Sequence, residues 1–323
     1  MMSDMSDNQH ITVLCPGQGA QAIGMARSWC EASSEAARVM EQADGILHGR
    51  LARPLSEICF DGPAELLNRT DVSQPAILAC SVACFHGIRA NDEAFNITSA
   101  SGLSLGEYTA LHLAGVMSFA DALETVAARG RLMQEAAESS TGGMVALMGA
   151  ADEAEAVSFC DSVLASLGEG EVLVCANFNA PGQIVLSGSE KACQMAVEKA
   201  GDSGFRAKAL PVAGAFHSSL MQPAADRMSD VLEGIDMQTP EVPVWSNVTA
   251  RPHGSDVEGI RKCLVEQITS PVRWSQSVQG MLESEYSGFH ELAPGKVLKG
   301  LMKRIDRKME VVNHDEPDPS YQH

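Results

Sequence analysis

Apolar positions in the first part of the chain fall into short continuous runs and longer stretches with helical spacing. Residues 11–15 predict a buried strand, and residues 96–100 predict a second extended stretch. Helical patterns cover residues 76–88, 105–114 and 119–138. The first of these helices is predicted to begin near Pro75, since proline suits a first helical turn. Strands that alternate with helices indicate a parallel sheet covered on both faces.

After residue 141 the pattern changes to a smaller unit with the order β-α-β-β-α-β, which is that of a ferredoxin-like fold. Its predicted strands are residues 144–148, 172–176, 183–187 and 206–212, and its predicted helices are residues 152–167 and 190–200. We therefore predict an α/β protein with a parallel-sheet core and an inserted ferredoxin-like subdomain.

The predicted large domain is discontinuous and consists of residues 11–140 and 213–312, with residues 141–212 as the inserted subdomain. Residues 1–10 are polar and acidic, and we expect them to be a disordered lead. We expect a disordered tail over residues 313–323.

The composition is that of an ordinary globular protein, with 45% hydrophobic and 20% charged residues. No apolar run reaches the length of about 18 residues needed to span a bilayer, and the N-terminus lacks the features of a secretory signal. These features predict a cytoplasmic protein with no membrane contact. A formal net charge of −19 argues against nucleic acid as a partner, because it would repel phosphates.

One stretch near the C-terminus departs from the acidic composition. A single predicted helix contains Lys296, Lys299, Lys303, Arg304, Arg307 and Lys308. Such a cluster is either a solvated helix face or a docking patch for an anionic partner, and the pattern leaves both interpretations open.

Ser104 is the first candidate for chemistry, in the motif Gly-Leu-Ser-Leu-Gly over residues 102–106. The motif lies between the second predicted strand and a predicted helix. Small residues on both sides of a serine permit a sharp turn that exposes its hydroxyl at a helix N-terminus. Backbone N–H groups there favour the negative charge that forms when a carbonyl is attacked. We predict that Ser104 is a nucleophile.

Two more residues could serve that serine. His217 precedes a predicted helix that runs to about residue 234. A helix N-terminus disfavours the imidazolium and leaves the ring able to accept a proton, although a capping or loop histidine would show the same pattern. Arg129 lies about 60° from the centre of the apolar stripe of its helix, at the edge of the buried face. It is either part of a structural ion pair or a fork for a substrate carboxylate.

The chain resembles the malonyl-CoA:acyl carrier protein transacylases of the acyltransferase family shared with fatty acid and polyketide synthases. The resemblance spans about residues 11–312 and rests on several motifs in the family's order. They are residues 16–21, 104–108, 129–130, 176–183, 215–218, 246–249 and 267–274. The resemblance implies that the parallel-sheet core is α/β-hydrolase-like.

Carried over to this sequence, the resemblance implies Ser104 as nucleophile and His217 as general base. Gln267 would orient His217 through its backbone carbonyl, and Gln18 and Leu105 would supply the N–H groups of the oxyanion hole. No carboxylate lies in an evident motif between Ser104 and His217, where the hydrolase order would require one. That absence fits a carbonyl in the orienting role.

The resemblance also implies how the substrate is held. Arg129 would pair with the free carboxylate of a malonyl group, and Phe216 would exclude branched acyl groups. Asn177 and Asn179 match family positions near the active site, although turn-forming roles explain them as well. The family usually has histidine where this chain has Leu103, which indicates neutral drift, an altered choice of acyl group or an impaired enzyme.

The implied activity is transfer of a malonyl group from malonyl-CoA to the phosphopantetheine thiol of acyl carrier protein, through a malonyl-serine, by a monomer. The substrate is a coenzyme A thioester, and no cofactor or metal is expected. Carrier proteins of this family are acidic, so Lys296, Lys299, Lys303 and Arg304 become a candidate docking site. A proofreading acyl hydrolase of the same family and a degenerate carrier-protein-binding module remain alternatives. The sequence leaves open whether the pathway makes fatty acids or polyketides.

Overall fold

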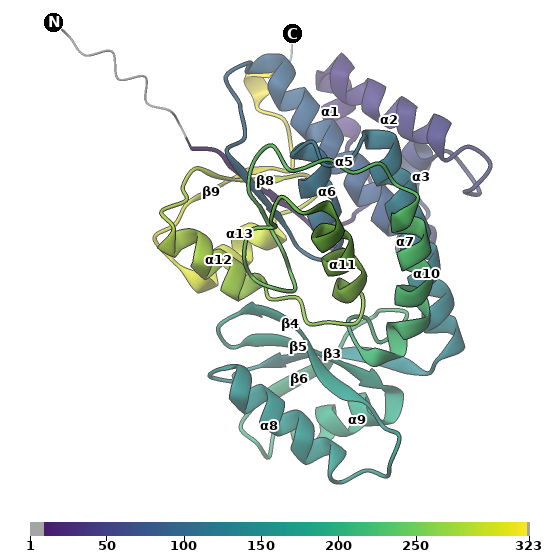
Figure 1. The fold of residues 1–323 in the computed structure, drawn as a ribbon, viewed down its shortest axis with the longest axis vertical. Helices are drawn as coiled ribbons and strands as arrows, with labels where there is room; N and C mark the ends of the chain where they lie inside the picture. Colours follow the sequence, from purple (N-terminus) through teal and green to yellow (C-terminus); the bar gives the residue numbers. More distant parts are fainter. Residues whose placement is uncertain (1–9, 322–323) are drawn as a thin grey trace, which may run out of the picture.

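A five-stranded parallel sheet forms the centre of the larger part of the protein (Figure 1). The computed structural model describes residues 10–321. The strand order is β7-β2-β1-β8-β9, and all neighbouring strands are parallel. The strands are β1 Thr12–Cys15, β2 Ser99–Gly102, β7 Val244–Trp245, β8 Phe289–Leu292 and β9 Val311–His314. The predicted parallel-sheet core is confirmed.

Helices surround this sheet, and the two longest, α5 and α7, pack against each other. The helices before the small subdomain are α1 Arg27–Ala32, α2 Ser34–Ile46, α3 Leu55–Asp61, α4 Ala64–Leu67, α5 Thr70–Asn91, α6 Leu105–Leu113 and α7 Phe119–Ser139. Those after it are η1 Ser219–Met221, α10 Gln222–Glu233, α11 Val257–Gln267, α12 Trp274–Glu283, α13 Val297–Ile305 and η2 Pro319–Tyr321. Within residues 10–321, no helix has both the length and the apolar character needed to cross a lipid bilayer.

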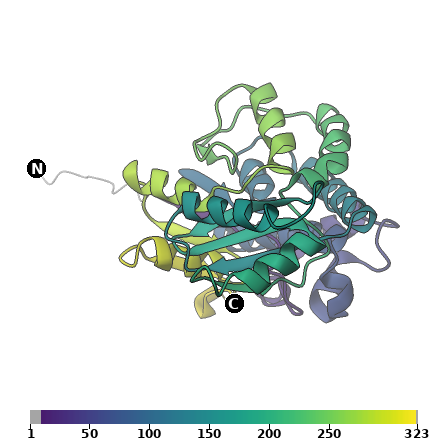
Figure 2. The same ribbon diagram turned by 90° about the horizontal axis from the view of Figure 1, so that it is seen from below.

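A second, four-stranded antiparallel sheet forms the small subdomain, at the bottom of Figure 1. Its elements are β3 Gly142–Met148, α8 Glu153–Leu164, β4 Leu173–Ala180, β5 Gln183–Ser189, α9 Glu190–Lys199 and β6 Arg206–Ala209. In Figure 2, which views the molecule from below, its two helices lie side by side and pack against the sheet. The spatial order β4-β5-β3-β6 is that of a ferredoxin-like unit, so the predicted fold class is confirmed. The predicted boundaries at residues 141 and 212 stay a prediction.

A backbone connection joins the two parts. The N–H of Val272 donates to the carbonyl of Ala176 at 2.8 Å, and the N–H of Phe178 donates to the carbonyl of Val272 at 2.9 Å. Strand β4 is thereby paired locally with the segment that follows α11. These bonds hold the subdomain beside the carboxyl ends of the parallel strands, where ligands bind in open α/β sheets.

The start of α5 differs from the prediction. The helix begins at Thr70 and contains Pro75 in its interior, so the predicted start near Pro75 was wrong. The first turn is held by tertiary contact, because the Thr70 N–H donates to the Gln134 side chain at 3.3 Å. A Cβ at Gly130 of α7 would lie 2.6 Å from the Thr70 carbonyl oxygen. This close approach of α7 stabilises a turn that local propensity does not favour.

The predicted disordered tail was also wrong over its described part. Strand β9 runs to His314 and pairs with β8, and the indole of Trp29 donates to the His314 carbonyl at 2.9 Å. The ring of Tyr321 lies 6.2 Å from that of Trp29. The apolar surface that α1 offers to this segment orders residues whose own composition is polar. The predicted disordered lead over residues 1–10 lies outside the described residues except for residue 10.

Candidate active site

Ser104 lies in a sharp turn between β2 and α6, as the motif predicts. Its backbone has φ 54° and ψ −105°, a conformation that non-glycine residues rarely adopt. A Cβ at Gly102 would lie 1.9 Å from the Gly106 carbonyl carbon, and one at Gly106 would lie 2.1 Å from the Cys15 carbonyl oxygen. Glycine is required at both positions, because the backbone of Gly106 lies against Gly102 and the backbone at the end of β1 lies against Gly106, leaving no space for a side chain.

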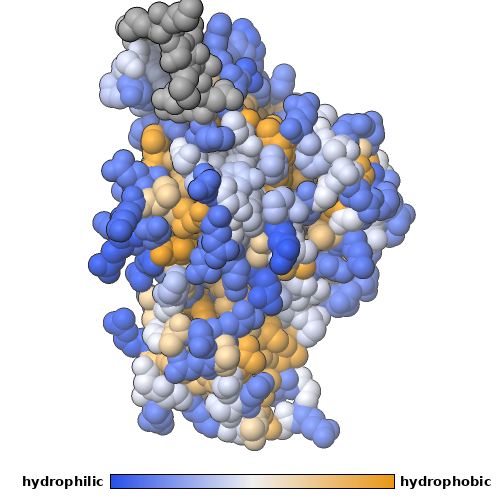
Figure 3. Space-filling model, turned by 60° about the vertical axis from the view of Figure 1, so that its left-hand side comes forward, coloured by the Kyte–Doolittle hydropathy of each residue, from blue (hydrophilic) through white to orange (hydrophobic). Residues whose placement is uncertain are grey.

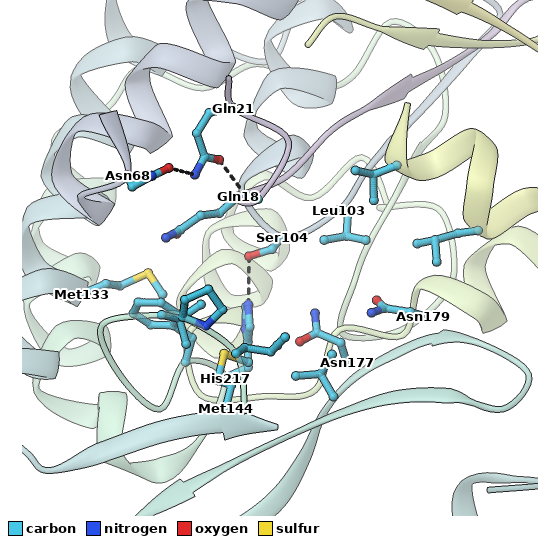
Figure 4. A pocket seen from close by; sticks show the side chains of 18 of the residues that line it. Gln18, Gln21, Asn68, Leu103, Ser104, Met133, Met144, Asn177, Asn179 and His217 are labelled. Atoms are coloured by element: carbon cyan, nitrogen blue, oxygen red, sulfur yellow. Dashed lines mark hydrogen bonds between the residues drawn. The ribbon is translucent and has the colours of Figure 1, made fainter. Parts of the chain in front are cut away.

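Ser104 and His217 form a hydrogen-bonded pair, drawn as a dashed line in Figure 4. The Ser104 Oγ lies 2.9 Å from His217 Nε2, and His217 Nδ1 lies 2.7 Å from the backbone carbonyl of Gln267. A carbonyl accepts, so Nδ1 carries a proton and Nε2 is free to accept one from the serine hydroxyl. Burial and the nearby charge of Arg129 lower the pKa of His217 to about 4. The imidazole is therefore neutral at pH 7 and able to act as a base.

Arg129 enters the site from α7 and is 1% exposed. Its Nη1 donates to Gln74 Oε1 at 2.7 Å, and its Nη2 donates to Ser104 Oγ at 3.1 Å and to Gln267 Oε1 at 2.9 Å. No Asp or Glu in the described part of the chain forms an ion pair with it. Of the two interpretations of Arg129, the geometry favours a cation that is available to an anionic ligand.

A buried layer behind the serine contains residues without a role in the sequence analysis. Asn247 accepts from the Ser104 N–H at 2.6 Å and donates to the Gly102 carbonyl at 2.7 Å, so it bridges the turn. Glu107 accepts from the Asn247 N–H at 3.0 Å and lies 2.7 Å from His253 Nε2. Glu107 and Asn247 fall within the quoted motifs, which was the available signal. His253 falls within none of them, and its contact with Glu107 spans 146 residues.

These groups open onto a pocket of about 570 Å³ between the sheet core and the small subdomain. The structure brings most of the predicted site residues together in its wall. They are Gln18, Leu103, Ser104, Arg129, Asn177, Asn179, Phe216 and His217. Leu105 and Gln267 are buried behind this wall. The roles of the Gln18 and Leu105 backbone N–H groups in an oxyanion hole stay predictions.

Leu103 contributes an apolar wall to the pocket, on the side toward α13 (Figure 4). It packs against the cluster that contains Leu298 and Leu301 of that helix. A Cβ at Gly17 would lie 2.3 Å from the Leu103 carbonyl oxygen, so the two loops that frame the serine touch here. Its side chain supplies packing in place of a hydrogen-bonding group.

The basic residues near the C-terminus are all exposed, but they do not share one helix as predicted. Lys299, Lys303 and Arg304 lie in α13, Lys296 precedes it, and residues 307–308 follow it. None of them forms a salt bridge with a described residue. Val297 and Leu301 of the same helix line the pocket, so α13 forms part of its wall. Hydrophilic side chains dominate the face shown in Figure 3, with separate apolar patches between them.

Comparison with known proteins gives concordant matches. Residues 12–315 match the family described as the acyl transferase domain. The chain is 39% identical over 309 residues to the malonyl CoA-acyl carrier protein transacylase of Bacillus subtilis, covering 95% of this chain and 94% of that protein. It is 35% identical to the solved structure of the Coxiella burnetii malonyl CoA-acyl carrier protein transacylase, with a TM-score of 0.89 and 95% and 94% of the two chains covered. A malonyl-transacylase solved in complex with a type II PKS acyl-carrier protein is 35% identical, with a TM-score of 0.88 and 95% and 96% covered.

Proposed function

The chain belongs to the acyl transferase domain family, and from that premise we propose that it transfers a malonyl group from malonyl-CoA to the thiol of acyl carrier protein. Family membership, which the motifs predict, is confirmed by the match over residues 12–315. The observation that carries the proposed substrate is the position of Arg129, whose Nη2 lies 3.1 Å from the Ser104 hydroxyl. A guanidinium at that distance can hold one end of a short diacid while the serine attacks the other.

In the proposed first half-reaction, Ser104 Oγ attacks the thioester carbonyl of malonyl-CoA and His217 Nε2 takes the hydroxyl proton. The N–H groups of Gln18 and Leu105 stabilise the oxyanion of the tetrahedral intermediate. The intermediate collapses by breaking the carbon–sulfur bond, and His217 returns the proton to the departing coenzyme A thiolate. The product is a malonyl-serine.

In the second half-reaction the phosphopantetheine thiol of the carrier protein gives its proton to His217 and attacks the malonyl-serine carbonyl. Breaking the ester bond restores Ser104, which recovers the proton from His217. Arg129 holds the distal carboxylate throughout and so orients the acyl group for attack by the thiol. The thioester is the substrate, and these steps call for no metal or further cofactor.

Phe216 supports a preference for unbranched malonyl groups. Its side chain is 5% exposed and lies in the pocket wall next to His217. A methyl branch on the acyl group would meet this ring, and displacing a ring that is packed in the pocket wall costs energy. Asn177 and Asn179 lie across the pocket on β4, where their amides can contact the pantetheine arm.

We further propose that the carrier protein docks on the basic residues around α13. Lys299 and Lys303 are exposed on α13, the helix whose Val297 and Leu301 line the pocket, on a protein with a formal net charge of −19. A local cationic surface on an acidic protein favours an acidic partner and orients its approach. The protein would act as a monomer in the cytoplasm.

Intact-protein mass spectrometry after brief mixing with malonyl-CoA tests the activity. We expect a malonyl adduct on the wild type that added holo-carrier protein discharges, and none on Ser104→Ala. Acetyl-CoA and methylmalonyl-CoA should label far less. An adduct that water discharges as fast as the carrier protein does would instead indicate a hydrolase, and no adduct would indicate a binding module.

Charge reversal tests the docking surface. Lys299→Glu with Lys303→Glu should raise the apparent KM for carrier protein several-fold and leave the malonyl-CoA half-reaction unchanged. The positive electrostatic field of the two lysines acts on the approaching acidic carrier protein. The matched control is Lys191→Glu with Lys262→Glu, two exposed lysines on α9 and α11. An equal effect of both pairs would reflect net charge alone and contradict this docking site.

A further inference from the structure

The Arg129 guanidinium is buried among neutral acceptors, and one of them is the side chain of Gln267. An amide has an accepting end and a donating end, so this contact forms in only one of its two orientations. With Oε1 toward Arg129 the amide accepts a charge-assisted hydrogen bond at 2.9 Å. In the reversed orientation its NH2 group would face a cation.

Glu107 selects the productive orientation of that amide. The Nε2 of Gln267 donates to Glu107 Oε2 at 2.6 Å and to the Ser104 carbonyl at 3.0 Å. Both partners accept only, since an ionised carboxylate and a carbonyl have no proton to give. Reversal would place Oε1 against the carboxylate in a site where neither residue has measurable exposure, and a buried unpaired polar contact is costly.

Glu107 is paired with His253 and forms no salt bridge with Arg129. The side chains of Glu107 and His253 are 0% and 2% exposed, with Oε1 and Nε2 2.7 Å apart. Burial opposes the charge on His253, but the neighbouring Cys263 and Glu107 side chains raise its pKa to about 9. The carboxylate charge is therefore balanced by an imidazolium on the side away from the pocket, and the guanidinium charge remains available to a ligand.

We propose that Glu107 is a positioning residue for the acyl-binding site. It fixes the Gln267 side-chain amide, and through it the Arg129 guanidinium, in the orientation that receives a substrate carboxylate. Gln267 then has two separate tasks: its backbone carbonyl orients His217, and its side chain orients Arg129. The expected effect on substrate choice rests on the proposed function, whereas the geometric claim does not.

The ratio of malonyl to acetyl labelling of Ser104 tests this chain of contacts from Glu107 through Gln267 to Arg129, since an acetyl group has no carboxylate for Arg129. Damage to the turn at Ser104 affects both substrates and cancels in the ratio. Gln267→Met keeps the backbone carbonyl that binds His217 and removes only the amide. We expect Gln267→Met and Glu107→Met each to lower the ratio about tenfold to a hundredfold, the effect of losing a hydrogen bond to a charged group.

Two further variants sharpen the comparison. The double variant, Gln267→Met with Glu107→Met, should lower the labelling ratio no more than either single variant, because both changes break the same chain of contacts to Arg129. Glu107→Gln can keep an accepting oxygen toward Gln267 and should stay within about threefold of the wild-type ratio. The control Glu135→Met, on the exposed face of α7, should leave the ratio unchanged. Equal loss of both substrates, or losses that multiply in the double variant, would overturn the proposal.

Crystal structures of Gln267→Met and Glu107→Met give a readout that does not depend on turnover. We expect the Arg129 guanidinium to leave its position beside Ser104 in both, and the Gln267 amide to turn in Glu107→Met. A wild type that forms no malonyl adduct would refute the proposed function. An unmoved Gln267 and Arg129 in Glu107→Met would refute the positioning role.

Discussion

At the scale of single residues, the surroundings of His217 determine its protonation state. His217 is 4% exposed and is held by a backbone carbonyl, which fixes the tautomer and carries no full negative charge. A carboxylate in that place would stabilise the imidazolium and raise the pKa. Burial, which has the larger effect, and the positive charge of Arg129 instead lower the pKa of His217 to about 4. The imidazole is therefore already neutral when the thioester arrives.

An NMR titration of the His217 ring can check this account. In the wild type we expect the ring to stay neutral from pH 8 down to about pH 5 and to protonate near pH 4. Arg129→Gln should raise this pKa because it removes a positive charge, although burial should still hold it below 6.5. Arg131→Gln, on the exposed side of the same helix, is the control. An unchanged titration in Arg129→Gln would contradict the electrostatic contribution.

Ser104 has a local signal in its turn motif, whereas the helix start at His217 and the edge position of Arg129 on an apolar stripe left other roles open until the family resemblance assigned theirs. Glu107 and His253 have none of comparable strength. Their contact joins α6 to the segment before α11 across 146 residues, and a charged pair gives no periodic pattern that reveals its partner. The function of such a pair becomes visible only when the fold brings its members together.

At the scale of elements, the glycines of the serine turn lie where backbone leaves no room for a side chain. Gly102→Ala should destabilise the protein by about 3 kcal/mol and abolish labelling of Ser104, because its Cβ would overlap the α6 backbone. Gly300→Ala is the matched control in α13, where a Cβ meets nothing within 4 Å. It should stabilise by about 0.5–1 kcal/mol through helix propensity. Thermal unfolding measures both, and shifts of the same sign would contradict this argument.

The alternation of strands and helices up to the small subdomain, and the element order within that subdomain, followed from hydrophobic periodicity, whereas β7, β8 and some element ends did not. Thr70 begins α5 five residues before Pro75 because α7 packs against that turn. Val311 and His314 extend the central sheet by a strand that the polar surroundings of the tail conceal. In both cases a distant element supplies the stabilising contact, and local sequence does not encode that contact.

At the scale of the whole molecule, the site depends on two separately packed units. The ferredoxin-like sheet has its own core, which includes Val145, Phe159 and Leu186, and the parallel sheet has another. Ser104, His217 and Arg129 come from the larger unit, whereas β4 and β5 close the pocket from the other side. The large unit can therefore position the chemistry rigidly while the small one shapes the space for the substrate.

The stability of the whole protein should depend on pH through its two buried histidines in opposite directions. The pKa of His217 is lowered to about 4, so the unfolded chain binds the extra proton and stability is lost as pH falls from 6.5 toward 4. The pKa of His253 is raised to about 9, so the folded protein binds the extra proton and stability is lost as pH rises from 6.5 toward 9. Each change corresponds to about 3 kcal/mol, so the combined contribution of these two histidines is most favourable near pH 6.5.

Urea unfolding of the wild type and His253→Gln at pH 6.5, 8 and 9 separates these contributions. The variant should be less stable at pH 6.5, because Glu107 loses its cationic partner in a buried site. Its free energy of unfolding should nevertheless change little between pH 6.5 and 9, whereas that of the wild type falls. His48→Gln changes an exposed histidine and should retain the wild-type slope. A variant that keeps this slope would show that His253 is neutral in the folded protein, and the charge balance that leaves Arg129 free for a carboxylate would then need another source.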